Sequence, residues 1–224
     1  MTNGAAVIDT TPPRANRWAE LGVVGTVVNA RIGVIQARAL KNESSGVAAL
    51  ARLRRGVGKQ SGEVQDILEY TFDPIFAKGA VGDDPTDREI AAHIAMTLYA
   101  LHQQSQRQPM HRRGYGLGRS VRQLNGPDVD GAPSPVRRRF NALGTADDLN
   151  ELVHHARGMV QLLRAKSIPL DYALLAEQLV RWQYLPNGPV SVRRIWGRDF
   201  YRTTTVPEQP DETTEPDTSA PEGN

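Results

Sequence analysis

The chain has 224 residues, of which 39% are hydrophobic, and it is long enough for one large domain or two small ones. Its best apolar run, Leu21 to Ala30, ends at Arg31 and falls short of the roughly 20 residues of a membrane span, so we expect a cytoplasmic protein with no membrane partner. With no cysteine, disulfides, thiolate nucleophiles and sulfur-ligated metal sites are excluded, while the formal net charge of +2 conceals an uneven distribution of charge.

The first predicted elements are helices that follow a disordered start. Residues 1–14 are expected to be disordered because they mix small residues with prolines. A helix reaching about residue 40 is predicted from an apolar stripe at steps of three and four, formed by Trp18, Leu21, Gly25, Val28, Ile32, Ile35 and Ala39. A strand over Val23 to Val28 remains an alternative. Shorter helices are predicted over 46–55, which Ser44 and Ser45 can cap, and over about 63–72.

Helix signals continue through the rest of the chain. Thr86 and Glu89 form a capping box, and the apolar spacing that follows predicts a helix ending near Gln106. Residues 125–135 have the composition of a loop, and residues 145–148 resemble a second capping box. Further helices are predicted over 149–163, over about 170–182 and over about 191–201. The sequence therefore predicts an all-α protein of two small packed helical bundles, 15–108 and 109–205, with a disordered acidic tail over 206–224.

No group of residues indicates an enzyme. The histidines lack the spacing of a metalloprotease helix, and His93 and His102 are expected on the flank of their helix. The glycine-rich stretch 114–118 lacks the dinucleotide spacing and is interpreted as a hinge or a loop of close backbone approach. Two acidic clusters, 83–87 and 147–151, could hold magnesium in a nuclease, but both lie where helices start, so capping is the favoured interpretation. We expect no catalytic residue, no metal and no cofactor.

Arginine is the feature that remains. Residues 206–224 carry six acidic residues and no basic one, so the other 205 residues have a balance of +8, with 23 arginines and four lysines. Such a balance indicates an anionic partner, although high genomic GC content also favours arginine. Eight arginines lie between Arg107 and Arg139. The predicted nucleic-acid-binding residues are Arg52, Arg54, Arg55, Arg112, Arg113, Arg119, Arg122, Arg137, Arg138, Arg139, Lys166, Arg193 and Arg194.

Backbone recognition without sequence preference is the chemistry that such a surface supplies. Tyr115 is the only aromatic residue within the glycine-rich basic stretch, so an aromatic platform for stacking bases is not expected. The acidic tail is hypothesised to compete with nucleic acid for the same surface.

Several segments resemble one family, the CasB small subunit of the type I-E CRISPR surveillance complex (Cascade). They are residues 48–56 (AALARLRRG), 138–143 (RRFNAL), 147–149 (DDL), 162–172 (LLRAKSIPLDY), Leu179, Trp182 and 192–201 (VRRIWGRDFY). Together they cover most of residues 15–203. By position, Arg54 and Arg55 match the family's amino-terminal signature, Arg119 its basic middle, and Arg138, Arg139 and Lys166 its carboxy-terminal block.

The resemblance implies an all-helical subunit without enzymatic activity. It implies that two copies pack head to tail inside the complex, against other Cascade subunits and the guide RNA. It also implies that the basic face helps to hold the target DNA strand and the displaced single strand of the R-loop. A guide–target hybrid and the DNA duplex it replaces are nearly balanced in free energy, so modest backbone contacts can decide the outcome.

Three alternatives remain open. The first is a helical protein-interaction or scaffold module whose arginines face acidic protein surfaces. The second is a helix-turn-helix regulator, although Leu174, Leu175 and Leu179 suggest that the helix near 170–182 is buried. The third is a metal-dependent nuclease built on the acidic clusters.

Overall fold

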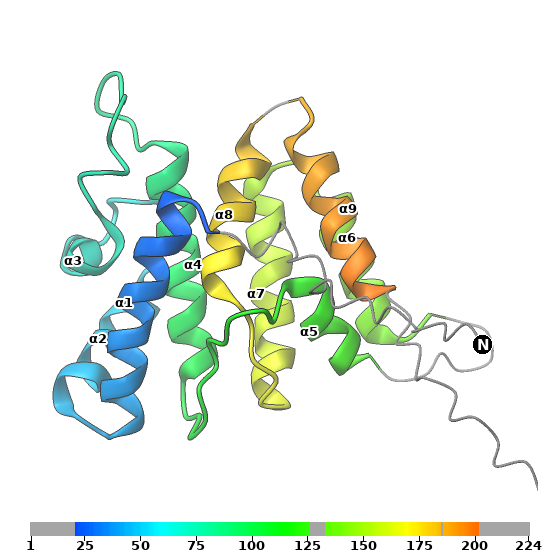
Figure 1. The fold of residues 1–224 in the computed structure, drawn as a ribbon, viewed down its shortest axis with the longest axis horizontal. Coiled ribbons are helices and arrows are strands. Elements are labelled where there is room, and N and C mark those ends of the chain that lie inside the picture. The colour runs from blue at the N-terminus through cyan, green and yellow to red at the C-terminus, as the bar shows by residue number, and fades with distance from the viewer. Residues whose placement is uncertain (1–20, 126–132, 185, 202–224) are drawn as a thin grey trace, which may run out of the picture.

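The computed structural model describes residues 21–125, 133–184 and 186–201, and within them the protein is all-α, as predicted. Nine α-helices and one short 3-10 helix make up the described part of the chain (Figure 1). Trp18, the loop residues 126–132 and the acidic tail lie outside the described residues.

The first half of the described chain contains four α-helices. They are α1 (Val23–Leu40), α2 (Ser44–Arg55), α3 (Leu68–Thr71) and α4 (Asp87–Gln103), with the 3-10 helix η2 (Gln65–Ile67) before α3. The strand alternative for residues 23–28 is therefore wrong. The helix predicted over 63–72 begins later and is split between η2 and α3. At α4 the predicted capping box is present, with the Glu89 amide donating to Thr86 Oγ1 and the Thr86 amide donating to Glu89 Oε2.

The second half contains five helices. They are α5 (Leu117–Leu124), α6 (Pro135–Thr145), α7 (Leu149–Ala165), α8 (Tyr172–Gln183) and α9 (Gly188–Phe200). Helix α5 was not predicted because its glycines indicated a hinge. Gly114 does have the left-handed φ of +79° that suits a turn, but Gly118 lies inside α5. Helix α9 begins three residues earlier than predicted because Pro189 occupies its first turn, where a proline needs no amide partner.

Helix α8 connects the two halves of the chain. It packs on α1 and α4 on one side and on α9 on the other, and it lies near the middle of the molecule (Figure 1). Helix α1 has no capping residue of its own; instead, the Gly25 amide donates to Glu177 of α8 at 2.6 Å. Gly25 permits this approach, since a Cβ there would lie 2.8 Å from the Ala173 carbonyl oxygen. The division into bundles 15–108 and 109–205 stays a prediction.

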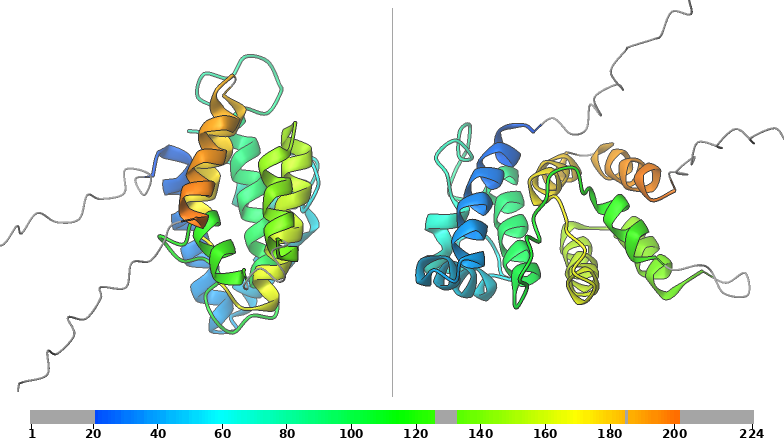
Figure 2. Two further views of the ribbon diagram at one scale, coloured as in Figure 1. Left: turned by 90° about the vertical axis from the view of Figure 1, so that its right-hand side faces the viewer. Right: turned by 60° about the horizontal axis from the view of Figure 1, so that its bottom comes forward.

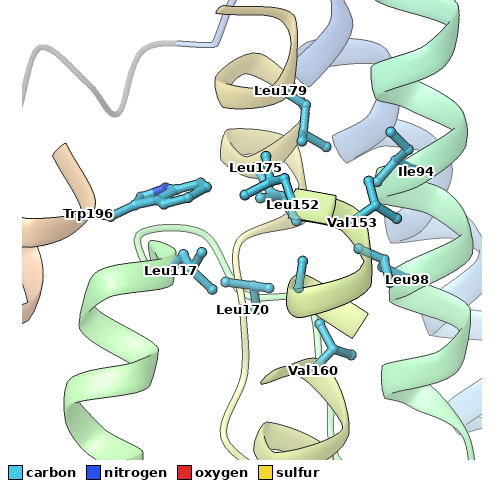
Figure 3. Close-up of a pocket in the computed structure, with 11 residues that line it drawn as sticks. Ile94, Leu98, Leu117, Leu152, Val153, Val160, Leu170, Leu175, Leu179 and Trp196 are labelled. Carbon is cyan, nitrogen blue, oxygen red and sulfur yellow. The ribbon is translucent and has the colours of Figure 1, made fainter. Parts of the chain in front are cut away.

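The core is apolar where α4, α7 and α8 meet α5 and α9. Figure 3 shows Leu98, Leu152 and Leu175 pointing toward one another, with Leu117 and Trp196 closing the side nearest α5 and α9. Trp196 is anchored by its indole N–H, which donates to Gln178 Oε1 at 2.7 Å. The helix spacing read from the sequence thus produces one continuous buried cluster.

Helix α1 is, within the described part of the chain, the one helix long and apolar enough to cross a membrane by length and composition. Its inner face is buried against α2, α4 and α8, and its outer face carries the exposed side chains of Val23 and Val34. Core helices of soluble proteins meet the same criterion, so this feature alone assigns no membrane span.

Candidate nucleic-acid interface

The segment between α4 and α5 carries the best-defined group of predicted site residues. We call residues 111–119, which include the first turn of α5, the basic loop. It crosses the α7–α8 connection, where the Leu170 amide donates to the Met110 carbonyl and the Arg112 amide donates to the Leu170 carbonyl (Figure 1). Arg112, Arg113 and Arg119 are exposed along it. The pairing fixes the backbone of the basic loop on the core of the protein.

Asp171, which the sequence analysis did not single out, is the main anchor of the basic loop. Its side chain is 1% exposed. The carboxylate accepts from the Gly114 amide at 2.8 Å and, as the N-cap of α8, from the Leu174 amide at 3.0 Å. Arg113 Nε lies 3.4 Å from the same carboxylate. One buried carboxylate thereby holds the backbone of the basic loop, contacts the Arg113 side chain and caps the N-terminus of α8.

His111 anchors the other end of the basic loop. Its Nδ1 accepts from the Tyr172 amide at 3.1 Å, and its Nε2 lies 3.1 Å from Asn29 Oδ1 on α1. Burial lowers the pKa of His111, so the neutral ring with the proton on Nε2 fits both contacts. Gln36 of α1 adds two hydrogen bonds to the His111 backbone. The basic loop is therefore fastened to both α1 and α8.

Two arginines contact the ring of Tyr115. The Arg112 Cζ lies 4.8 Å and the Arg119 Cζ lies 4.2 Å from the centre of its ring. Arg119 also donates to the Gly114 carbonyl oxygen at 3.1 Å. Within the described residues, neither Arg112 nor Arg119 has a carboxylate partner. The ring of Tyr115 therefore makes cation–π contacts with two side chains of its own loop.

The other predicted residues, on α5, α6 and α9 and at the end of α7, divide into packed and exposed ones. Arg193 donates to the Ala146 carbonyl at 2.6 Å, and its guanidinium carbon lies 5.0 Å from the centre of the Trp182 ring. The guanidinium carbon of Arg137 lies 5.6 Å from the centre of the Tyr201 ring. Both arginines therefore pack against residues outside their own helices. Arg122 is half-buried and engaged in contacts. The exposed residues are Arg138, which donates to the Pro133 carbonyl, and Arg139, Arg194 and Lys166.

The arginines of α2 form a separate group. Arg52 pairs with Glu69 at 2.9 Å and Arg55 pairs with Asp66, both in the segment around η2 and α3. Arg54 is half-buried and has no ion pair with a described residue. Helix α2 lies at one end of the long axis, whereas α5, α6 and α9 lie at the other (Figures 1 and 2). The thirteen predicted residues therefore do not form a single surface.

Three other sequence expectations can be compared with the structure. His93 and His102 are buried rather than on a helix flank, because α4 is enclosed on most sides by α1, α2, α7 and α8. His93 Nε2 lies 3.1 Å from the Gly56 carbonyl and 3.0 Å from the Lys59 carbonyl, which holds the glycine-containing segment after α2. Of the acidic clusters, Asp148 caps α7 through the Glu151 amide. Across residues 21–125, 133–184 and 186–201, no three histidine or acidic side chains gather as metal ligands.

Fold and site together define an all-α protein that carries a fixed, arginine-rich loop. Residues 49–201, about two thirds of the chain, match the family model of the CRISPR-associated protein Cse2. The chain belongs to this family, and the resemblance to CasB seen in the sequence is confirmed. Among curated proteins, no match is found.

Solved structures are similar over most of the chain. The crystal structure of CasB from Thermobifida fusca is 42% identical, with a TM-score of 0.68, and the match covers 81% of this chain and 99% of that one. CasB from Thermus thermophilus is 25% identical, with a TM-score of 0.56 over 78% of this chain and 97% of that one. A chain of a CRISPR RNA-guided surveillance complex shares the fold, with 22% identity and a TM-score of 0.60 over 80% and 94% of the two chains.

Proposed function

We propose that this chain is a non-catalytic subunit of a type I-E CRISPR RNA-guided surveillance complex, in which its exposed arginines bind nucleic-acid backbone. The target strand and the displaced single strand of the R-loop are the proposed ligands, and other Cascade subunits, guide RNA and a second copy of the chain are the proposed partners. Family membership supports the proposal that the chain is a subunit of such a complex, since a chain of similar fold belongs to a surveillance complex. A cytoplasmic location follows from this proposal.

The observation that carries the nucleic-acid role is the pair of exposed arginines at Tyr115. Arg112 and Arg119 have no carboxylate partner in the described part of the chain, and the loop that holds them is anchored by a buried aspartate. Unpaired guanidinium groups on a fixed backbone gain most from an anionic ligand, because little order remains to be imposed when the ligand binds. Phosphate is the anion that the planar fork of arginine fits best.

A salt series tests the proposal. Binding of a fluorescent oligo(dT) strand to the wild type is compared with binding to a variant in which Arg112, Arg119, Arg139 and Arg194 are all changed to Ala. Each lost phosphate contact lowers the log–log salt slope by about 0.7 for a single strand, so four contacts would lower it by about 2.8. Far-ultraviolet circular dichroism confirms that the variant keeps its helices. A wild type that fails to bind at low salt would overturn the direct nucleic-acid role.

A second candidate function is a scaffold that contacts only protein. Exposed apolar side chains on the outer face of α1 and α2 favour it, namely Val23, Val34, Leu40 and Val47, which are 38–51% exposed. Such a module would join the assembled complex without binding the DNA strand alone. Reconstitution of the complex with the four-arginine variant separates the two candidates, because a scaffold would support R-loop formation undiminished.

A further inference from the structure

The geometry points to a phosphate-binding site at Arg112 and Arg119 in which Tyr115 is a positioning residue that sets the spacing of the two guanidinium groups. This inference rests on the proposed function and specifies where and how the backbone is bound. Tyr115 itself was absent from the predicted binding residues. It lies three residues after Arg112 and four residues before Arg119, and the turn between Arg112 and Tyr115 is closed by a hydrogen bond.

The two guanidinium groups are close together in spite of their equal charge. With their Cζ atoms 4.8 Å and 4.2 Å from one ring centre, they lie no more than about 9 Å apart. Two like charges at this distance repel each other, and the negative face of the tyrosine ring offsets part of the cost. A negatively charged ligand between or beside the two guanidinium groups offsets the remaining repulsion. A separation of this size or less lets the two groups contact one phosphate or neighbouring phosphates of one strand, since B-DNA has one phosphate per about 3.4 Å of axis on each strand.

The site is fixed before any ligand arrives. Asp171 is buried, accepts from the Gly114 amide and donates its own amide to the Tyr115 carbonyl at 2.7 Å. Ser120 Oγ bonds to the Pro169 carbonyl at 2.7 Å and holds the first turn of α5 on the same connection. Tyr115 is therefore held at its backbone on one side and stacked at its ring on the other. A prepared site loses less conformational entropy on binding than a free pair of arginines.

The ring of Tyr115, rather than its hydroxyl, has the positioning role, because both arginines are placed relative to the ring. Tyr115→Phe should keep the site, and Tyr115→Leu should lose it. The arginines contact charge, not bases, so a strand of abasic deoxyribose phosphate should bind as tightly as oligo(dT). An aromatic platform would instead bind the abasic strand more weakly, by roughly fivefold or more for each base that stacks.

The test is a double-mutant cycle on the full chain with labelled oligo(dT) at low salt. We expect Tyr115→Leu to weaken binding roughly fivefold and Tyr115→Phe to leave it within about twofold. In an R112A/R119A background, Tyr115→Leu should have no further effect, because its role passes through those arginines. A purely structural role would persist in that background. Arg88→Ala is the matched control, because Arg88 lies in the first turn of α4, about 22 Å along the helix from the end that leads to the basic loop.

The outcomes separate the two claims. A wild type that does not bind the strand overturns the proposed function. A wild type that binds while Tyr115→Leu and R112A/R119A behave like Arg88→Ala overturns this inference and leaves the proposed function to the other exposed arginines. Equal losses for Tyr115→Leu with and without the two arginines also overturn it, since the tyrosine would then act by another route. Weaker binding to the abasic strand would overturn the inference that the site binds phosphate and not bases.

Discussion

Gly118 of α5 lies directly against the carbonyl oxygen of Trp196 in α9, so closely that a Cβ on the glycine would be 2.1 Å from that oxygen. The contact joins the helix that carries Arg119 to the last described helix of the chain. It also explains why a glycine occurs inside a helix, where it costs about 1 kcal/mol relative to alanine. The position of the basic loop relative to the core depends on this approach.

Gly118→Ala should therefore destabilise the protein by about 1–3 kcal/mol, because the backbone of α9 cannot yield as a side chain can. Gly144→Ala in α6 is the matched control. A Cβ there has open space around it, so a gain of about 0.4–1 kcal/mol is expected. Urea unfolding, monitored by circular dichroism, measures the stability of both variants. Equal stability of the two variants would show that α5 and α9 do not pack as described.

Arg193 and Arg194 are neighbours in sequence with opposite expected roles. Arg193 is half-buried and bonded to the Ala146 carbonyl, so Arg193→Ala should cost about 1–3 kcal/mol of stability. Arg194 is exposed, so Arg194→Ala should leave stability within about 0.5 kcal/mol and lower the salt slope for single-stranded DNA by about 0.7. Thermal unfolding measures the stability of the two variants, and a salt titration on the same samples measures their salt slopes. The reverse assignment would refute the distinction between packed and exposed arginines.

His102 should make the protein less stable in acid. It is fully buried with its Nδ1 2.9 Å from the Tyr172 hydroxyl, and burial, followed by the charge of Arg164, lowers its pKa to about 3. Below its ordinary pKa of 6.5, the unfolded chain binds a proton that the folded chain excludes. The free energy of unfolding should then fall by about 1.4 kcal/mol per pH unit on account of this residue.

The comparison for His102 is with His102→Gln, which keeps a polar side chain next to Tyr172. His93 and His111, whose pKa values are also lowered by burial, are unchanged in both proteins, so their contributions cancel. Urea unfolding at several pH values between 6 and 4 should show a shallower decline for the variant. Parallel curves would mean that His102 titrates alike in the folded and unfolded chains.

The acidic tail provides a test of the competition hypothesis. Tyr201, the last described residue, lies beside Arg137 of α6, and Glu208 is seven residues further on, so that it stays within about 25 Å of this point. A chain ending at residue 205 should bind single-stranded DNA roughly threefold or more tightly at low salt, and the difference should disappear at high salt. Unchanged affinity at low salt would refute competition by the tail.

Local signals predicted those parts of the fold that depend on neighbours in sequence. The capping box of Thr86 and Glu89 and the apolar stripe of α7 needed only residues a few positions apart, and both are present. Helix α5 was missed because Gly118 serves a contact with α9 that lies 78 residues away in sequence. Composition indicated a hinge at a place where tertiary packing selects glycine.

The sequence predicted the chemistry of the site better than it predicted which residues belong to the site. Clustering of arginines drew attention to the basic loop, but ion pairs such as that of Arg55 with Asp66 depend on the fold. Tyr115 and Asp171 were missed as parts of the site. The spacing of Arg112, Tyr115 and Arg119, three and four residues apart, was a usable signal for the first, whereas nothing near Asp171 in the sequence indicates its bond to Gly114.

The cap that Glu177 provides for α1 has a consequence for synthesis on the ribosome. The Gly25 amide and the carboxylate that satisfies it are 152 residues apart. At about 5–20 residues per second, α1 is made roughly 8 to 30 seconds before its partner helix exists. During this interval α2 and α4 can already pack on α1, but the face of α1 that contacts α8 remains apolar surface exposed on the nascent chain. The chain completes its tertiary structure only once α8 has been made.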